Sequence, residues 1–252
     1  MVDTKGLIGQ ILERYDDPEL AITIKATAQN GEDVLMNEYE KLHAKLVIEW
    51  ASKLSGVYDS VIISAAAHDW DRAFPEIRVP YSDSKDPSLY WDYKIMHSIN
   101  TANIFHSKFN QHLEPSLMSD VVYLIKRHEI GGKKANGSLI YTPDNFSNSF
   151  NLEEAAENLK IADSVGGFLA LIDKGPLLSA RGKDYVLKKM DFYYGRASDT
   201  AKTIIDKLQL SNPLIIDLFQ EYKQSRGQVI QDAEPLDLEA KFEMLNRRYS
   251  KI

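Results

Sequence analysis

The sequence predicts an all-α fold in a single domain. Apolar residues recur at three- and four-residue intervals through most of the 252-residue chain, which is the spacing of one buried helix face. No segment sustains the alternation of apolar and polar residues that marks a half-buried strand, apart from a candidate short hairpin near Asn136-Gly137. No internal repeat, low-complexity tract or linker divides the chain.

The first part of the chain contains three of the predicted helices. One is expected over residues 5–15, and a second over residues 33–54, where large apolar side chains follow one another at helical spacing. The apolar segment 59–72 forms the third. Asp59 is its expected N-cap, because a short polar side chain can accept a hydrogen bond from the free N–H groups at a helix start.

The same spacing continues to the end of the chain. Asn151 is the expected N-cap of one later helix, with Glu153 and Glu154 in its first turn, where negative charge interacts favourably with the helix dipole. We expect these later helices over residues 87–110, 116–130, 152–172, 183–209, 213–225 and 236–249.

The predicted organisation has three parts. At this length one large domain with appended segments is expected. We expect an N-terminal helical extension (1–32), a metal-binding helical domain (33–210), and C-terminal helices that pack on the same domain (211–252).

The composition excludes several classes of protein. The formal net charge of -7 argues against general nucleic-acid binding, which usually shows as a basic surface. Because the chain has no cysteine, any metal must be held by imidazole and carboxylate groups. No apolar run reaches the roughly 18 residues that span a membrane, and the N-terminus lacks the apolar core of a signal peptide. We therefore expect a cytoplasmic protein that does not bind membranes.

Four of the six histidines fall into two facing pairs. Helices joined by a short loop usually pack antiparallel, so residues equidistant from the loop lie at one level. His43 and His68 are equidistant from the Ser55-Gly56 turn, and His97 and His128 are equidistant from the loop between their own helices. Each helical hairpin is thus expected to bring two imidazoles together.

Two aspartates extend this set. Asp69 follows His68 in an apolar segment, where a buried His-Asp pair is costly unless a cation lies against it. Asp163 is a lone acid among apolar and small residues and is expected to face inward. Four imidazoles and two carboxylates suffice for two divalent ions bridged by one carboxylate. Such donors suit iron, manganese, cobalt, nickel or zinc better than calcium, and magnesium is also allowed.

The order of these six residues, H…HD…H…H…D, resembles the HD-domain superfamily of metal-dependent phosphohydrolases over about residues 33 to 205. The resemblance implies a helical bundle that binds one or two divalent metal ions. It implies that a first ion is held by His43, His68, Asp69 and Asp163. It further implies that a second ion shares Asp69 and is held by His97 and His128.

Two positions depart from the family pattern. The family often has a lysine four residues after the histidine of the His-Asp pair, in contact with substrate phosphate, and Arg72 stands there in this chain. Because arginine can make two parallel contacts with phosphate, we expect Arg72 to act with Asp69 in catalysis. The alternative is that Arg72 only pairs with Asp71 or Glu76. Where the family often has two adjacent histidines, this chain has His128-Glu129, which leaves the completeness of the second metal site open.

Further candidates for substrate binding are basic or aromatic. Lys133 and Lys134 follow Gly131-Gly132 at the start of the loop-like segment 131–151, which could close over a substrate. The candidates for the opposite wall of the substrate site are Tyr193, Tyr194 and Arg196. The alternatives are that the glycines only end a helix, that the lysines are only solvated, and that the tyrosines only pack against other side chains.

The leading functional hypothesis is a hydrolase that cleaves a phosphomonoester or phosphodiester bond of a small, anionic, nucleotide-like substrate. Metal-activated hydroxide would attack phosphorus while nearby cations stabilise the developing charge. A first alternative is a mixed-valence di-iron oxygenase for a small polar or phosphonate substrate, as in the superfamily members that resemble myo-inositol oxygenase and phosphonate-cleaving oxygenases. A second alternative is a non-catalytic domain that binds a nucleotide or a protein. Arg72 favours phosphorus chemistry.

Overall fold

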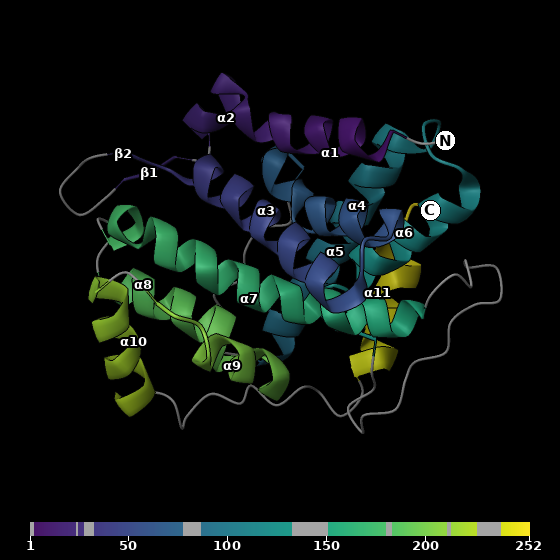
Figure 1. Ribbon diagram of the computed structural model, residues 1–252. Helices are drawn as coiled ribbons and strands as arrows, with labels where there is room; N and C mark the ends of the chain where they lie inside the picture. Colours follow the sequence, from purple (N-terminus) through teal and green to yellow (C-terminus); the bar gives the residue numbers. More distant parts are fainter. Residues whose placement is uncertain are drawn as a thin grey trace.

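The computed structural model describes residues 3–23, 25–27, 33–77, 87–132, 151–179, 183–210, 213–225 and 238–252. Within these residues the chain is almost entirely helical, with one short two-stranded antiparallel sheet (Figure 1). The predicted all-α class is confirmed. The hairpin predicted near Asn136-Gly137 lies outside the described residues.

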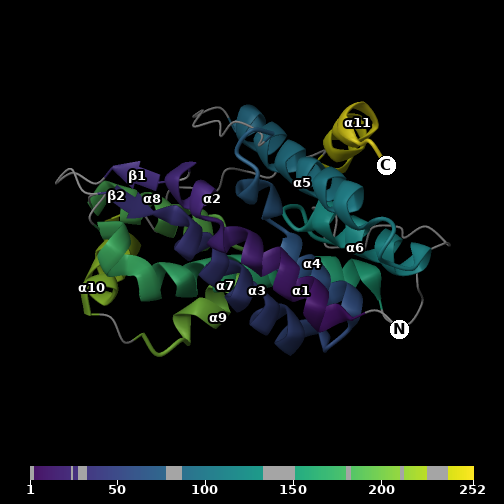
Figure 2. The same cartoon turned by 90° about the horizontal axis from the view of Figure 1, so that it is seen from above.

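Five helices form the centre of the molecule. The two long helices α3 (Met36–Ser55) and α7 (Leu152–Ser179) run side by side. A second pair, α5 (Pro87–Phe109) and α6 (Pro115–Arg127), packs together, and the short helix α4 (Asp59–Ala67) lies between the two pairs (Figure 2). Every residue of the predicted metal set comes from these helices or from the turns that end them.

The remaining helices cover this centre. α1 packs on α4, while α8, α9 and α10 pack on α7, and the C-terminal helix α11 packs on α5. The bounds are α1 Thr4–Glu13, α2 Pro18–Thr23, α8 Lys183–Met190, α9 Asp199–Asp206, α10 Pro213–Ser225 and α11 Leu238–Tyr249.

Two predicted helices are divided or shortened. The segment predicted as a helix from residue 33 begins as a strand, β2 (Asp33–Leu35), which pairs with β1 (Lys25–Thr27). This hairpin crosses the boundary that we expected at residue 32. The segment predicted as one helix over 183–209 is interrupted by a π-helical turn, Asp191–Gly195. Apolar spacing continues through that turn, so the pattern could not reveal the interruption.

The two predicted N-caps had different outcomes. Asn151 caps α7 as expected, because its side-chain oxygen accepts a hydrogen bond of 2.9 Å from the Glu154 backbone N–H. The expectation for Asp59 was wrong, since Tyr58 is the N-cap of α4 and Asp59 is its first helical residue. At that position the carboxylate still lies in the favourable first turn.

Two adjacent glycines of α7 allow the close packing of its neighbours. A Cβ atom on Gly166 would lie 2.9 Å from the Val47 backbone nitrogen of α3. A Cβ atom on Gly167 would lie 2.0 Å from the ring of Tyr193. Because these glycines lie about one turn beyond Asp163, their small size brings that part of α7 close to α3.

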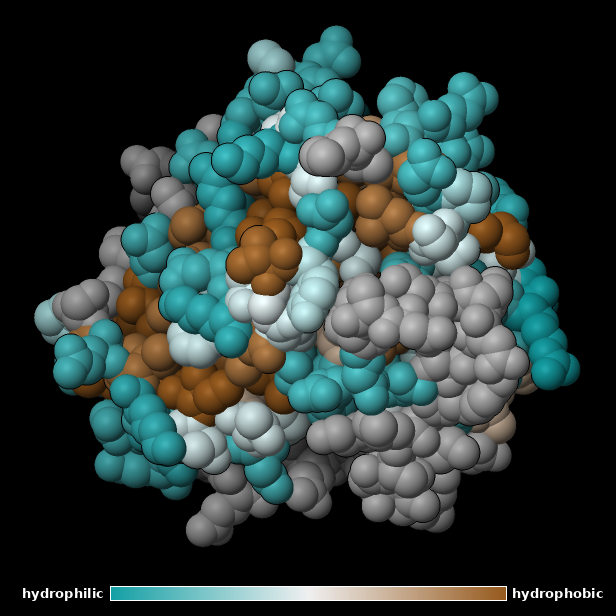
Figure 3. Space-filling view, turned by 45° about the vertical axis from the view of Figure 1, so that its right-hand side comes forward, coloured by the Kyte–Doolittle hydropathy of each residue, from teal (hydrophilic) through white to brown (hydrophobic). Residues whose placement is uncertain are grey.

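Figure 3 shows hydrophobic residues gathered over the centre and left of this face, with hydrophilic residues around and between them. None of the helices described is long and apolar enough to cross a membrane.

Candidate metal centre

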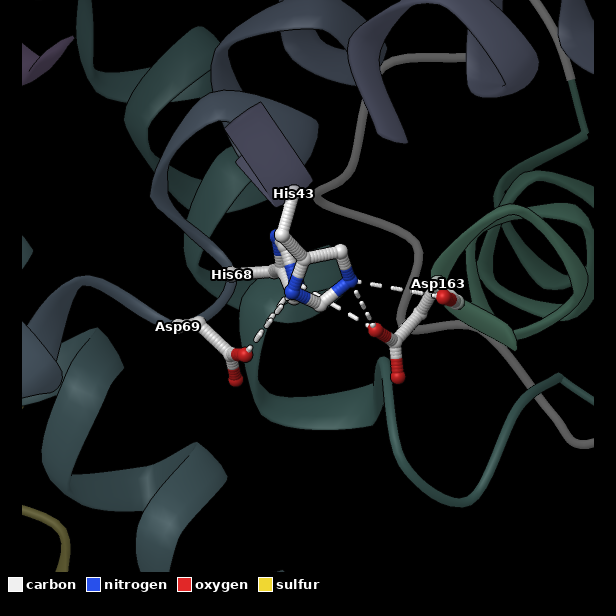
Figure 4. A group of neighbouring side chains, drawn as sticks. All are labelled: His43, His68, Asp69 and Asp163. Carbon is white, nitrogen blue, oxygen red and sulfur yellow. Dashed lines mark hydrogen bonds and ion pairs between the residues drawn. The ribbon is translucent and has the colours of Figure 1, made fainter. Parts of the chain in front are cut away.

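The six residues of the predicted metal set lie together in the interior, and each is at most 7% exposed. The expected facing of the imidazoles is observed in both hairpins. The ring centres of His43 and His68 are 5.0 Å apart, and those of His97 and His128 are 5.6 Å apart. Figure 4 shows the aspartates beside the first pair, with Asp163 reaching in from α7.

Two of the imidazoles sit at helix ends rather than inside helices. The predicted helices 59–72 and 116–130 stop earlier than expected, at Ala67 and Arg127, so His68 and His128 are C-cap residues. Carbonyl groups in the last turn of a helix have no partner within the helix. The Nδ1–H groups of these two histidines donate to such carbonyls, with N to O distances of 2.8 Å each, to Ala65 and Ile125.

This arrangement aims the second ring nitrogen inward. A neutral imidazole that donates through Nδ1 carries a lone pair on Nε2. The Nε2 atoms of His68 and His128 are buried and have no hydrogen-bond partner among the residues that the structure describes. An Nδ1–H bonded to a backbone carbonyl with Nε2 left for an ion is the usual geometry of a metal-binding histidine. These two side chains therefore fit a metal ion.

Asp69 lies between the two imidazole pairs. Its Oδ1 is 2.7 Å from Nε2 of His97 and 3.7 Å from Nε2 of His128. Its Oδ2 is 3.5 Å from Nε2 of His68 and 3.6 Å from Nδ1 of His43. Burial alone would raise the pKa of this carboxyl, but Arg72 and the imidazoles hold the pKa well below its ordinary value. Asp69 is therefore a buried carboxylate.

Asp163 faces the first imidazole pair. Its Oδ1 is 2.9 Å from Nε2 of His43 and 3.4 Å from Nε2 of His68. Burial opposes ionisation, yet the two imidazoles beside it lower the pKa of Asp163 well below its ordinary value. Both aspartates are thus negatively charged at neutral pH, and a bound cation can neutralise this charge.

These side chains form donor groups compact enough to hold a metal ion. In each group the donor atoms lie within 4.8 Å of one another. Asp69 belongs to two of these groups, so one carboxylate links them. The first group is His43, His68, Asp69 and Asp163, and the second is Asp69, His97 and His128.

The imidazole of His97 is held by a carboxylate on each side. Its Nδ1 is 2.8 Å from Oδ2 of Asp71, which is fully buried. Burial would lower the pKa of His97, but Asp71 and Asp69 outweigh it and raise the pKa to about 10. A carboxylate that orients a metal-binding histidine is a recurring feature of metal sites. From the sequence, we considered Asp71 only as a partner of Arg72, because no local sequence pattern indicates that Asp71 contacts α5.

Arg72 lies between two carboxylates. Its NH1 is 2.6 Å from Oε2 of Glu40, and its NH2 is 2.9 Å from Oδ2 of Asp69. Neither contact involves Asp71 or Glu76, which we considered as alternative partners of Arg72. Glu40 was missed by sequence reasoning, although it lies three residues before His43 and so shares its helix face. Arg72 therefore orients Asp69 and favours its charged form, and each terminal nitrogen of its guanidinium contacts a carboxylate.

A second buried ion pair borders the second donor group. Lys94 of α5 binds Glu129, which directly follows His128. Burial alone would raise the pKa of Glu129, but Lys94 and His128 lower it to about 2. Glu129 Oε1 lies 3.7 Å from Nε2 of His128, and these two residues form a third compact donor group with Asp163. Glu129 directly follows His128, where the superfamily that the sequence resembles often has a second histidine, and this position was the available signal.

The candidates for substrate binding are placed differently. Lys133 and Lys134 lie outside the described residues. Gly131 ends the turn after α6, with φ +74° and an N–H that donates to the Arg127 carbonyl at 2.7 Å. This agrees with the alternative that the glycine terminates a helix.

The adjacent tyrosines face different surroundings. Tyr193 is buried, and its ring centre lies 5.5 Å from that of His43. Tyr194 instead directs its hydroxyl to Asp206 at 3.0 Å. Arg196 lies over the ring of Tyr90, 4.0 Å from its centre. The structure therefore brings Tyr193, rather than Tyr194, to the candidate metal ligands.

Comparison with known proteins found no matching family model, no matching curated protein and no matching solved structure.

Proposed function

We propose that the protein is a metal-dependent phosphohydrolase of the HD-domain type. It would cleave a phosphomonoester or phosphodiester bond of a small, nucleotide-like substrate with one or two divalent transition-metal ions. The observation that carries this proposal is the position of Asp69, whose two oxygens face separate imidazole pairs. A carboxylate shared by two donor groups suits two bridged ions. When bound, such ions supply Lewis acidity and a water of lowered pKa.

The residues of the chain support this chemistry in distinct ways. Asp71 orients His97, and the carbonyls at the ends of α4 and α6 orient His68 and His128. Arg72 keeps Asp69 ionised and aligned. Because the set is buried, charges on a bound phosphate would interact with it more strongly than in bulk water.

Elemental analysis of the purified protein, followed by a panel of phosphoesters with added manganese, tests the proposal. We expect bound transition metal and release of phosphate or of a phosphomonoester. Asp69→Ala should abolish both, while Asp69→Asn, which keeps the shape and removes the charge, should weaken metal binding. Full metal occupancy in Asp69→Ala would contradict the assignment, as would a metal-loaded protein that cleaves no member of the panel.

One observation favours a second candidate on the same site. The engagement of Arg72 with Glu40 and Asp69 weakens the argument from Arg72 for phosphorus chemistry. Four imidazoles and two carboxylates also fit a mixed-valence di-iron oxygenase acting on a small polar or phosphonate substrate. Iron content with oxygen-dependent turnover, and no cleavage of any phosphoester, would distinguish this candidate.

A further inference from the structure

The C-terminal helix α11 lies beside the helices that carry the second donor group. In that group His97 belongs to α5, and His128 directly follows α6. α11 packs on α5, and Figure 2 shows it on the outer side of the α5–α6 pair, away from α3 and α7. The first donor group comes from α3, α7 and the residues that follow α4, so α11 adjoins the second group only.

Arg127 closes the turn that presents His128. Its backbone carbonyl accepts hydrogen bonds from the N–H groups of Ile130 and Gly131, at 3.1 and 2.7 Å. Its side chain closes the same turn a second time, because Nε donates to the Gly131 carbonyl at 2.8 Å. Residues 127–131 therefore form one hydrogen-bonded unit, and the ring of His128 is carried by it.

The side chain of Arg127 is held in turn by α11. Its two terminal nitrogens donate to the two carboxylate oxygens of Glu239, at 3.1 and 2.9 Å, and its guanidinium carbon lies 5.0 Å from the centre of the Phe242 ring. A two-fold contact of this kind fixes direction as well as distance. Ile130, in the turn, packs in the same apolar cluster as Phe242 and Leu245. Because Arg127 is 2% exposed, loss of the Glu239 charge would leave a buried guanidinium without its ionic partner.

We infer that Glu239 is a positioning residue for the second metal ion, because it holds Arg127 and thereby the turn that presents His128. This inference rests on the proposed function, in which His128 is a ligand of that ion. Coupling between two sites is reciprocal, so the ion also strengthens the docking of α11. The C-terminal helix therefore docks more firmly when the second donor group is occupied.

Manganese titration of the metal-free protein tests the effect on the ions. Calorimetry gives the two affinities, and the paramagnetic resonance signal of two coupled ions identifies the second one. Glu239→Gln keeps the shape of the side chain and removes its charge. We expect it to weaken binding of the second ion by about ten-fold, the lower end of the usual effect of removing a group behind a ligating histidine. The affinity for the first ion should stay unchanged, which also shows that the variant is folded.

Asp92→Asn is the matched control. Asp92 forms another ion pair between α5 and α11, with Lys241 at 2.5 Å, and lies outside the 127–131 turn. This substitution removes a charge from the same helix interface but leaves Arg127 and Glu239 in place, so both manganese affinities should stay unchanged. A purely structural role of the α11 ion pairs would change the affinities in both variants alike.

Hydrogen exchange of the α11 amides tests the reciprocal effect. Occupation of the second donor group should slow this exchange in the unaltered protein and in Asp92→Asn. In Glu239→Gln the same occupation should slow it much less, because the connection through Arg127 is broken.

The outcomes separate the inference from the proposed function. Equal manganese affinities in Glu239→Gln and Asp92→Asn would overturn the inference and leave the proposed phosphohydrolase standing. Equal weakening of both ions in Glu239→Gln would overturn it as well, since that variant would then disturb the whole centre. If the unaltered protein binds no metal, the proposed function fails and the inference fails with it.

Discussion

At the residue scale, the side chains of the candidate metal centre are held in place by neighbouring groups that are not proposed as ligands. His97 receives its orientation from Asp71, and Asp69 receives its charge state from Arg72. Each of these supporting residues is buried, so it can act only on its immediate neighbours. Their substitution therefore tests the site without removing a ligand.

Asp71→Asn is expected to lower the affinity for metal by about 10- to 100-fold, the usual effect of removing a carboxylate behind a ligating histidine. The amide keeps a hydrogen-bond acceptor for Nδ1 of His97 and removes only the negative charge. Competition with a chromophoric chelator measures the affinity. Asp206→Asn, on the surface, serves as the control, and equal affinities in the two variants would rule out a role for Asp71.

Arg72→Met is expected to destabilise the metal-free protein by about 3 kcal/mol or more, because it leaves the buried carboxylate of Glu40 without its partner. Urea unfolding measures this loss. Adding Glu40→Gln removes the unpaired charge and should restore part of the stability. A double variant no more stable than the single one would show that the Arg72–Glu40 contact does not account for the loss.

At the element scale, helix ends and close helix contacts position the site. α4 and α6 each end one residue before a histidine whose Nδ1–H binds a carbonyl of the last turn. α7 approaches α3 and Tyr193 through its two glycines, which bring Asp163 to His43.

Gly167→Ala is expected to destabilise the protein by about 1–3 kcal/mol, because the new methyl group would overlap the Tyr193 ring. The same substitution at Gly9 of α1, where nothing lies within 4 Å of the new Cβ, should stabilise the protein by about 0.5–1 kcal/mol through helix propensity. Thermal and urea unfolding compare the two variants. Opposite signs are expected, and stabilisation by both would contradict the packing described at Gly167.

At the scale of the whole molecule, charge buried in the centre links metal binding, protonation and folding. In the metal-free protein, nearby carboxylates raise the pKa of His97 to about 10 and that of His128 to about 9, although burial alone would lower both. Both rings are therefore protonated at neutral pH before metal binds. A bound metal ion would replace those protons, including the one on Nε2 of His128, and would neutralise the aspartates in their place.

The metal-free protein is expected to lose stability as the pH rises. The pKa values of both histidines in the folded protein lie above the ordinary value of 6.5. Their contribution to the free energy of unfolding is therefore complete below about pH 6.5 and is lost as the pH approaches 9 to 10. Urea unfolding at several pH values measures this trend. Metal binding near pH 7.5 should release about two protons, which calorimetry in buffers of different ionisation enthalpy detects. A free energy of unfolding that does not change with pH, together with no proton release, would contradict this description.

Much of the centre could be predicted because it follows from local spacing. Short turns make neighbouring helices antiparallel, so the positions of four histidines in the chain were enough to place them in facing pairs. The interruption at Asp191–Gly195 and the strand Asp33–Leu35 were not predictable in this way. In both segments the local pattern of apolar residues is compatible with a helix. Contacts with other parts of the fold determine the observed structure instead.

The sequence by itself determined the helical class, the absence of thiolate ligands and the level at which each imidazole pair meets, because periodicity and loop length are local properties of the chain. Only the tertiary structure decided that Arg72 binds Glu40, that Lys94 binds Glu129 and that Asp71 supports His97. The physical reason is that a buried charge needs an opposite charge or a hydrogen-bond partner. Which partner lies within reach depends on how helices distant in sequence are rotated against one another.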